Sequence, residues 1–240
     1  MKIISFDIWG DYGHFRKYYT TSSPLTFSFP PPSTIRGILG SIFGVNQKDE
    51  YLRIFSHDVC KVSLRIINPI KKVRIGINLI NTKDNKWTLY RSKYHDPRTQ
   101  IKFEFLKDPH YRIYIFHKDE NIFKNIVSLL KEHRSIYTVS LGLSELLADF
   151  KYIGEYEGAM MSSTEKIDIS TPIVLNNLIN GEFEIENEKK YCKEKLPIKM
   201  TQERIVEEYS DIIFELQGNS MKARLKEFCK LDNGENIAFF

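Results

Sequence analysis

Cysteine, tryptophan and long apolar runs are scarce in this 240-residue chain, and each shortage excludes a class of protein. The three cysteines, Cys60, Cys192 and Cys229, lie far apart and form no C-x-x-C pair, so neither a disulfide framework nor a zinc site is expected. No apolar run reaches the roughly 18 residues of a membrane helix. The short, charged start of the chain does not fit a signal peptide. We therefore expect a cytoplasmic protein that has no membrane partner.

The spacings of common catalytic motifs are also missing. None of the six histidines shows the H-x-x-x-H or H-E-x-x-H spacing of a metal site, and there is no Walker A loop and no G-x-S-x-G turn. We therefore expect no metal and no small-molecule cofactor. Metal-independent RNA cleavage needs only a base, an acid and a cation, which His14, His95 or His110 could supply together with Lys or Tyr. A lone loop histidine is more often structural.

Hydrophobic residues make up 42% of the chain, which is enough for a real core. Alternating and helical periodicities predict an α+β fold. The predicted strands cover 4–8, 25–29, 59–67, 73–80, 101–106 and 111–116, and the predicted helices cover 33–43, 50–55 and 121–133. Asp119 is the expected N-terminal cap of the last helix. This order is typical of a ferredoxin-like βαββαβ unit with an enlarged hairpin inserted.

We predict three regions along the chain. Residues 1–155 form the ferredoxin-like domain, which includes a basic hairpin at about 71–107. Residues 156–182 are polar and contain a run of Asn, so they are predicted to be a linker or long loop. Residues 183–240 contain short alternating segments and are predicted to form a small strand-rich C-terminal part.

The stretch F-P-P-P-S-T-I-R-G-I-L-G-S-I-F-G, residues 29–44, predicts an abrupt change from extended chain to helix. Ser33 is the expected N-cap and Gly44 the expected left-handed C-cap. Gly37 and Gly40 each cost roughly 1 kcal/mol relative to Ala inside a helix. Two interpretations stay open: the glycines allow close helix–sheet packing, or they keep the helix start clear for a phosphate.

Positive charge is concentrated in one part of the chain. Residues 71–102 contain nine Lys and Arg and two Asp, which gives a local charge of +7. Residues 182–240 contain ten Lys and Arg and thirteen Asp and Glu, which gives a charge of −3. Trp87, Tyr90 and Tyr94 are interleaved with these cations, which suits a phosphate backbone with stacked bases. A solvated hairpin face is the competing interpretation. Farther on, Gly142 and Ser144 precede a predicted strand, where a plain turn competes with a phosphate-binding loop.

These segments together resemble the CRISPR-associated Cas-five family, a branch of the RAMP superfamily, and most closely its archaeal and type I-B-like members. The resemblance rests on the opening strand I-I-S-F-D-I-W-G with the loop H-F-R-K-Y-Y, on F-P-P-P-S-T-I-R-G-I-L-G-S-I-F-G, and on L-G-L-S-E-L-L-A-D-F. They span roughly the first 155 residues in the family's order. The second motif is quite specific and the other two support it.

The resemblance implies an RRM-like domain with a hairpin thumb, in a subunit that caps the 5′ handle of crRNA within a Cascade surveillance complex for antiviral defence. The implied partners are crRNA, a backbone subunit and the large subunit. The expected RNA-binding residues follow from their positions in the matched regions rather than from matched motif residues: they are Arg16, Lys17, Ser33, Thr34, Arg36, Lys72, Arg74, Trp87, Tyr90, Arg91, Lys93, Arg98, Gly142 and Ser144.

Three functions are weighed. The first is a non-catalytic crRNA-handle-binding subunit, and the second is an endoribonuclease that makes the handle, as in the type I-C branch of the family. For that branch the resemblance implies a Tyr, Lys and His set with the Tyr near the end of the first helix, where this chain has Phe43 and no Tyr between Ser33 and Glu50. Binding is therefore favoured over cleavage. The third is an RNA-binding protein outside CRISPR systems.

Overall fold

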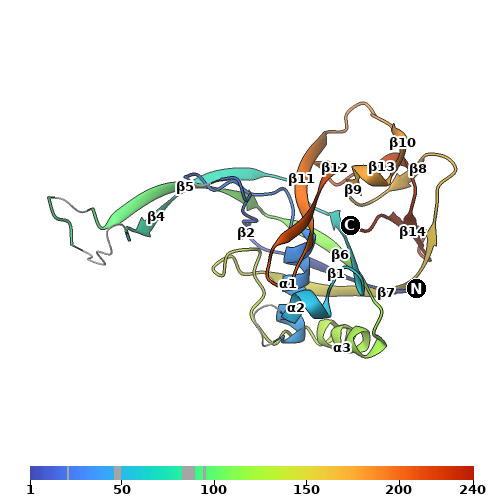
Figure 1. Ribbon diagram of the computed structural model, residues 1–240, viewed down its shortest axis with the longest axis horizontal. Helices are drawn as coiled ribbons and strands as arrows, with labels where there is room; N and C mark the ends of the chain where they lie inside the picture. The colour runs from blue at the N-terminus through green and yellow to red at the C-terminus, as the bar shows by residue number, and fades with distance from the viewer. Residues whose placement is uncertain (21, 46–49, 83–89, 94–95) are drawn as a thin grey trace.

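The structure is a computed structural model, and it describes every residue except 21, 46–49, 83–89 and 94–95 (Figure 1). It is a mostly-β α+β protein. The expected helices and most expected strands are present. The helices are α1 (Pro32–Phe43), α2 (Glu50–Ile54) and α3 (Glu120–Lys131), with a 3-10 turn at Leu175–Asn177. The strands of the first part of the chain are β1 (Lys2–Trp9), β2 (Tyr12–Gly13), β3 (Cys60–Ile66), β4 (Lys72–Ile80), β5 (Arg98–Lys107), β6 (His110–His117) and β7 (Asp149–Met161).

A six-stranded antiparallel sheet forms the centre of the body, with the strand order β15-β14-β7-β1-β6-β3. Its central strand β1 pairs with β6 on one side and β7 on the other, and both pairings are antiparallel. Side chains alternate across β1, so Ile4, Phe6 and Ile8 belong to one core and Ile3 to another on the opposite face. Helices α1 and α3 pack on the side of Ile4 and Phe6.

The N-cap of helix α1 lies two residues earlier than the capping pattern predicted. Pro31 is the N-cap and no side chain caps the helix, so the prediction of Ser33 as the cap was wrong. Pro32 fits the first helical position because the N–H that it lacks would have no partner there. The carbonyl of Pro31 accepts from the N–H groups of Thr34 and Ile35 at 2.9 and 3.0 Å. The left-handed C-cap at Gly44 is confirmed, with φ at 86°.

The cap of α3 is also confirmed, since Asp119 accepts from the N–H groups of Asn121 and Ile122. The expected strand at 25–29 is reduced to a single bridge between Arg16 and Thr26. Three prolines follow this stretch directly, and a proline cannot donate to a strand ladder.

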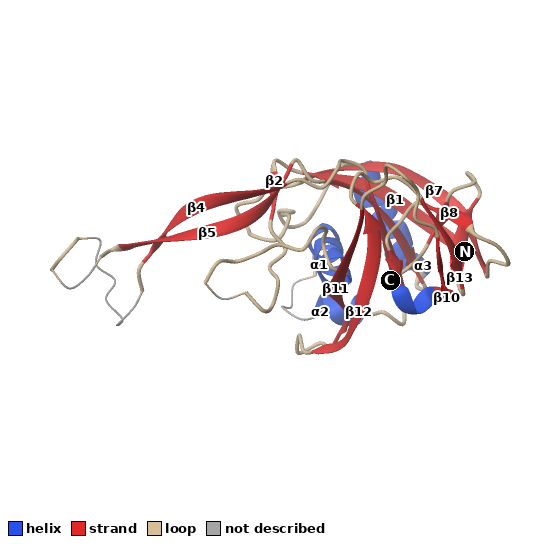
Figure 2. Ribbon diagram, turned by 90° about the horizontal axis from the view of Figure 1, so that it is seen from above, coloured by secondary structure: helices blue, strands red, loops and turns tan. Residues whose placement is uncertain are grey.

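The inserted hairpin leaves the body between β3 and β6, as predicted. Strands β4 and β5 pair along their whole length from Lys72 with Leu106 to Ile80 with Arg98. Both views show this hairpin projecting away from the rest of the molecule (Figures 1 and 2). We call residues 71–107 the thumb. It rests on the body through β2, which pairs with β5 at Gly13 and Leu106.

The C-terminal strands are β8 (Ile167–Ile169), β9 (Ile173–Val174), β10 (Leu178–Phe183), β11 (Tyr191–Met200), β12 (Val206–Glu215), β13 (Met221–Leu225), β14 (Phe228–Leu231) and β15 (Asn236–Ile237). The expected linker at 156–182 is therefore largely strand, because the polar side chains that suggested a loop alternate with buried ones. Strands β14 and β15 extend the main sheet, and Leu196, Ile212 and Phe214 share the main core. The three-region division stays a prediction. No described helix is long and apolar enough to cross a membrane.

The two glycines inside α1 have different surroundings, which gives a first prediction. A Cβ at Gly40 would lie 2.8 Å from Cβ of Tyr51 on α2, so this glycine permits close helix–helix packing rather than the helix–sheet packing considered above. A Cβ at Gly37 would meet only Cε2 of Tyr51, at an ordinary 3.8 Å. Gly37→Ala should raise the free energy of unfolding by up to about 1 kcal/mol, through helix propensity. Gly40→Ala should lower it by roughly 1–3 kcal/mol, because Tyr51 must move.

Urea denaturation of the two variants beside the wild type measures both effects. Each variant gains the same methyl group in the same helix, so they are controls for each other. Equal midpoints for the two variants would contradict the packing role of Gly40.

Candidate nucleic-acid interface

The thumb has one polar and one apolar face, because side chains alternate along its two paired strands. The polar face carries Lys72, Arg74, Asn78, Arg98, Gln100, Lys102 and Glu104. The apolar face carries Val73, Ile75, Ile77, Leu79, Ile101, Phe103 and Phe105. Lys102 and Arg98 lie on the outer half, opposite Gly76 and Ile80. This half is exposed and carries positive charge, as the sequence predicted.

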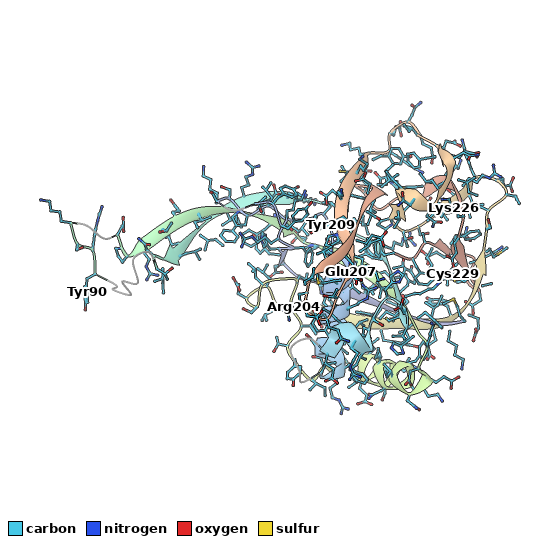
Figure 3. The ribbon with its side chains drawn as sticks, viewed as in Figure 1. Tyr90, Arg204, Glu207, Tyr209, Lys226 and Cys229 are labelled. Carbon is cyan, nitrogen blue, oxygen red and sulfur yellow. The ribbon has the colours of Figure 1, made fainter. Side chains whose placement is uncertain are left out.

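The outer end of the thumb holds three of the predicted phosphate contacts. Arg91, Lys93 and Arg98 are all exposed there. Tyr90, an expected stacking residue, is 83% exposed and lies at the far end of the thumb (Figure 3). Among the described residues, no carboxylate forms an ion pair with Arg91 or Arg98. Trp87 and His95 lie outside the described residues.

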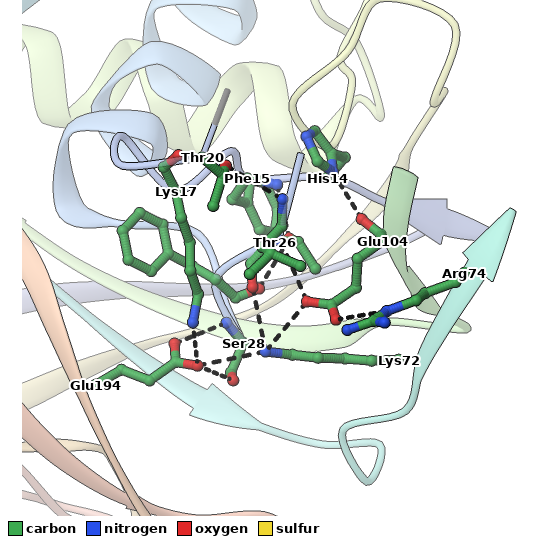
Figure 4. A network of polar contacts seen from close by, with 12 residues as sticks. His14, Phe15, Lys17, Thr20, Thr26, Ser28, Lys72, Arg74, Glu104 and Glu194 are labelled. Atoms are coloured by element: carbon green, nitrogen blue, oxygen red, sulfur yellow. Dashed lines mark hydrogen bonds and ion pairs between the residues drawn. The ribbon is translucent and has the colours of Figure 1, made fainter. Parts of the chain in front are cut away.

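The inner end of the thumb is different, because its cations are already paired. Glu194 on β11 lies 3.2 Å from Nζ of Lys17 and 3.3 Å from Nζ of Lys72 (Figure 4). The same carboxylate accepts from the backbone N–H and the hydroxyl of Ser28. Lys72 also donates to the carbonyl of Thr26. Two of the expected RNA contacts, Lys17 and Lys72, thus hold the thumb base to the N-terminal loop and to β11.

A second carboxylate extends this network along the thumb. Glu104 accepts from the backbone N–H of Thr26 at 3.3 Å and lies 3.9 Å from Nε of Arg74 (Figure 4). Arg74 is 71% exposed, so this pair is weak and leaves the guanidinium accessible. Arg16 is exposed as well, and its Nη2 donates to the carbonyl of Thr20. Arg16 and Arg74 thus keep accessible guanidinium groups beside the network.

Three tyrosines beside this network were missed as site residues. Tyr18 packs against Tyr19 and Tyr209, with ring centroids 5.1 and 4.9 Å apart. All three rings are exposed, and Figure 3 places Tyr209 on the body near the root of the thumb. Exposed aromatic faces beside cations suit base stacking. The paired tyrosines of the loop H-F-R-K-Y-Y gave a signal for the first two, but Tyr209 comes from β12, far along the chain.

The proline–helix motif and the glycine loop meet at one pocket of about 390 Å³. Ser33, Thr34 and Gly142, which were singled out separately, all contribute to its wall. The others are Gly37, Ile38, Ser41, Tyr51, Ser140, Met200 and Arg204. Arg204 lies over the ring of Tyr51, 5.9 Å from its centroid. Gly37 is thus the glycine whose missing side chain leaves room at the pocket, in line with the second interpretation of this helix.

Gly142 itself has a structural reason to be glycine. Its φ is +104°, and a Cβ there would lie 1.9 Å from the carbonyl oxygen of His14. The N–H of His14 donates to the carbonyl of Leu141, which keeps the two loops in contact. Ser144 is exposed and its hydroxyl donates to Glu145. The turn interpretation of this loop accounts for the glycine without a ligand, and the phosphate interpretation stays a prediction.

Arg36 does not project to the surface as expected. Its side chain is 3% exposed, and Nη1 donates to the carbonyl of Ile198 at 3.5 Å. Strand β11 covers the flank of α1 that the helical pattern left polar, and this accounts for the burial of Arg36. A contact between Arg36 and RNA stays a prediction.

The candidate catalytic histidines are not brought together in the described part of the chain. His14 is buried, its Nδ1 is 2.8 Å from the carbonyl oxygen of Glu104, and its pKa is lowered mainly by burial. His110 lies on β6, where Nε2 is 3.3 Å from Oδ2 of Asp7. Among the described residues, no three His, Cys, Asp or Glu side chains form a group that could hold a metal ion.

Comparison with known proteins decides the family. A family model described as CRISPR-associated protein (Cas_Cas5) matches residues 3–194, most of the chain. The chain belongs to this Cas5 family. No curated protein matches it. The resemblance noted in three motifs is therefore confirmed at the level of the family, and the match continues past those motifs into β11.

Solved structures support the Cas5 assignment at the level of the fold. A CRISPR protein from Archaeoglobus fulgidus has a TM-score of 0.58 at 13% identity, over 98% of this chain and 97% of that one. A chain of a structure described as a CRISPR RNA-guided surveillance complex has a TM-score of 0.55 at 11% identity, over 92% and 91%. The Cas5 chain therefore shares the fold of these two CRISPR proteins.

The Glu194 network yields a prediction about pH. Burial alone would raise the pKa of this carboxyl, but Lys72, Lys17 and the donors of Ser28 outweigh burial and hold the pKa below its usual value of 4.5. A lowered folded-state pKa means that the carboxylate stabilises the fold above pH 4.5 and that this contribution is lost as the pH falls through the folded pKa. Glu194→Gln should cost about 1–3 kcal/mol at pH 7, because Lys17 and Lys72 lose their counterion.

The test is the difference in free energy of unfolding between wild type and Glu194→Gln from pH 7 to pH 3. The difference should shrink below pH 4.5 as the wild-type carboxylate is protonated. Glu208→Gln, on an exposed position of β12, serves as the control and should change little. A difference that is constant with pH would contradict the role of the charge.

Proposed function

We propose that this Cas5-family chain is a non-catalytic RNA-binding subunit of a type I Cascade-type surveillance complex, in which it holds the 5′ handle of crRNA. The observation that carries the proposal is the thumb: a paired hairpin that projects from the body and bears exposed cations on its outer half (Figure 2). A projecting cationic element reaches a phosphate backbone that the body alone cannot reach. A chain of the same fold occurs in a structure described as a CRISPR RNA-guided surveillance complex, which supports the same context.

We also infer that the body is a ferredoxin-like unit. Strands β1, β3, β6 and β7 with α1 and α3 follow the chain order βαββαβ, and their order in the sheet is β7-β1-β6-β3. On this view the thumb is an insertion between the second and third strands of the unit. Strands β14 and β15 then extend the sheet beyond its fourth strand.

The proposed RNA path has three parts. The outer thumb would contact phosphates through Arg91, Lys93 and Arg98, with Tyr90 available for stacking. The tyrosine cluster of Tyr18, Tyr19 and Tyr209 would stack bases at the thumb root. The pocket beside α1 would bind the next nucleotide of the RNA through the hydroxyls of Ser33 and Thr34. Base contacts in this arrangement are few, so sequence preference would come from the tyrosine cluster and the pocket.

The first test is the salt dependence of crRNA binding. For single strands the logarithm of affinity falls with the logarithm of salt by about 0.7 for each neutralised phosphate. The double variant Lys93→Glu and Arg98→Glu should bind more weakly, with a slope smaller by about 1.4 if each cation contacts one phosphate. Fluorescence anisotropy of a labelled handle RNA across a salt series measures both quantities.

Its matched control reverses two cations elsewhere. Lys118→Glu with Lys124→Glu changes the net charge equally, at exposed positions beside and on α3, away from the thumb (Figure 1). This control should keep the wild-type slope. If the thumb variant kept the wild-type slope as well, the thumb would not be part of the interface.

The second test concerns catalysis. We expect no cleavage of repeat RNA by the purified chain, with or without EDTA, because His14 is buried and His110 is in contact with Asp7. A denaturing gel after long incubation at excess protein is the measurement. Discrete cleavage at a fixed position, lost in His14→Ala, His95→Ala or His110→Ala, would instead establish the endoribonuclease alternative.

A further inference from the structure

The guanidinium of Arg36 is buried without a counterion. Its Nε and Nη2 atoms have no hydrogen-bond partner, and its one contact is the 3.5 Å bond from Nη1 to the carbonyl of Ile198. No carboxylate of the described residues forms an ion pair with it. The nearby thiol of Cys60 is no substitute, because burial raises its pKa to about 12 and keeps it neutral.

An arginine stays charged in proteins, so this arrangement is costly as it stands. Removing a charge from water without a partner costs several kcal/mol, and buried charges are normally paired. Burial lowers the pKa of Arg36, which reports the same cost. The described part of the fold supplies no anion to offset it, which leaves room for a compensating charge from a bound ligand.

The two nitrogen atoms without a hydrogen-bond partner, Nε and Nη2, are the ones with which a guanidinium recognises oxyanions. Nε–H and the adjacent Nη2–H form the side fork of a guanidinium, which binds two oxygens in parallel. Arg112 shows this use within the same molecule: its Nε is 2.7 Å from Oδ1 of Asp7 and its Nη2 is 3.1 Å from Oδ2. In Arg36 the equivalent Nε and Nη2 atoms have no hydrogen-bond partner.

A cavity of about 150 Å³ lies beside Arg36. Its wall includes Ser56 and His57 after α2, and Lys199 and Thr201 at the end of β11. Lys199 is 44% exposed, so the cavity reaches solvent on that side. A water molecule takes roughly 30 Å³ of liquid volume, so the space holds one polyatomic anion with part of its hydration.

Among the described charged groups around the cavity, Arg36 is the one whose charge has no nearby counterion. Lys199 and Glu207 form a pair at 3.6 Å, and Asp58 is exposed at the rim. The pKa of His57 is lowered by desolvation and by Arg36, so its ring is neutral at pH 7. The ammonium of Lys199 and the hydroxyl of Ser56 line the same cavity and add donors to those of Arg36. This number of donors suits a phosphate group, which offers more oxygens than a carboxylate.

We propose that Arg36, assisted by Lys199, binds a phosphate group in this cavity. The site is separate from the thumb and does not depend on the function proposed above. Two sources share this chemistry, a free phosphate ion and a phosphate of an RNA strand that passes the mouth of the cavity. Arg36 is thereby both a structural residue of the core and a ligand-binding one.

Inorganic phosphate is the probe. The melting temperature of the full chain is measured in phosphate against chloride at equal ionic strength, and binding is measured by calorimetry. Wild type should show a saturable rise in melting temperature, since a ligand that binds only the folded state stabilises it in proportion to the logarithm of its concentration. Arg36→Met should bind phosphate roughly ten- to a hundredfold more weakly. Arg134→Met, which removes an exposed cation that is outside both the thumb and the cavity, is the matched control and should behave as wild type.

Arg36→Met should also be no less stable than wild type without phosphate, because it removes an unpaired buried charge. Should it fail to fold, Lys199→Met, near the surface, should still weaken phosphate binding, and the wild-type titration decides in any case. Absence of saturable phosphate binding to the wild type overturns the proposal. So does unchanged binding by a folded Arg36→Met, or protection by acetate equal to that by phosphate, which would point to a carboxylate from a protein partner.

A second arm separates the two sources of phosphate. If single-stranded RNA displaces phosphate and Arg36→Met weakens RNA binding, the site takes a phosphate of the strand. If phosphate raises the melting temperature, RNA does not displace it, and RNA binding is unchanged in Arg36→Met, the site holds the free ion. Either result supports the site. The thumb variant should bind phosphate as the wild type does, even if it no longer binds RNA, so the two proposals can fail separately.

Discussion

The buried carboxylate of Glu194 is the contact on which the arrangement of the interface depends. Its side chain is 9% exposed and joins Lys17 of the N-terminal loop, Lys72 of the thumb and Ser28 before the proline run. Glu194 itself lies on β11, more than 120 residues along the chain from Lys72. Its two cations and the hydroxyl donor therefore join the N-terminal loop, the thumb base and β11 at one point. The cost of burying this charge is offset by its four donors.

The thumb itself follows from a simpler constraint. A two-stranded hairpin is marginally stable in water on its own. Here its inner end is fastened by β2 and by a small apolar contact in which Phe103 and Phe105 pack with His14. The outer half has only its own ladder, and its exposed polar face is rich in cations. Rigidity at the base and exposure at the end are what an element that reaches for a charged partner requires.

Helix α1 shows how one short motif serves several purposes through its period of 3.6 residues. Ile35, Ile38, Leu39 and Ile42 face the sheet, while Ser33, Thr34 and Gly37 face the pocket shared with Gly142. Gly40 faces Tyr51 of α2 and allows the two helices to touch. Arg36 points to a fourth direction, under β11. The environment of each side chain depends on its direction around the helix axis and on which element packs against the helix on that side.

The sequence by itself determined the three helices and most strands of the first 155 residues, the caps at Gly44 and Asp119, the inserted hairpin and its charge, because these depend on local periodicity and backbone chemistry. The family followed from the same local motifs. Tertiary structure decided what local patterns do not encode: that Lys17 and Lys72 are paired with Glu194, that Tyr209 joins Tyr18 and Tyr19, and that residues 156–182 are largely strand. It also decided that Arg36 is buried, since a cation next to an apolar stripe looks the same in sequence whether solvent or another strand covers it. Burial is a property of what packs from elsewhere in the chain, and here the covering strand is more than 160 residues away from the helix.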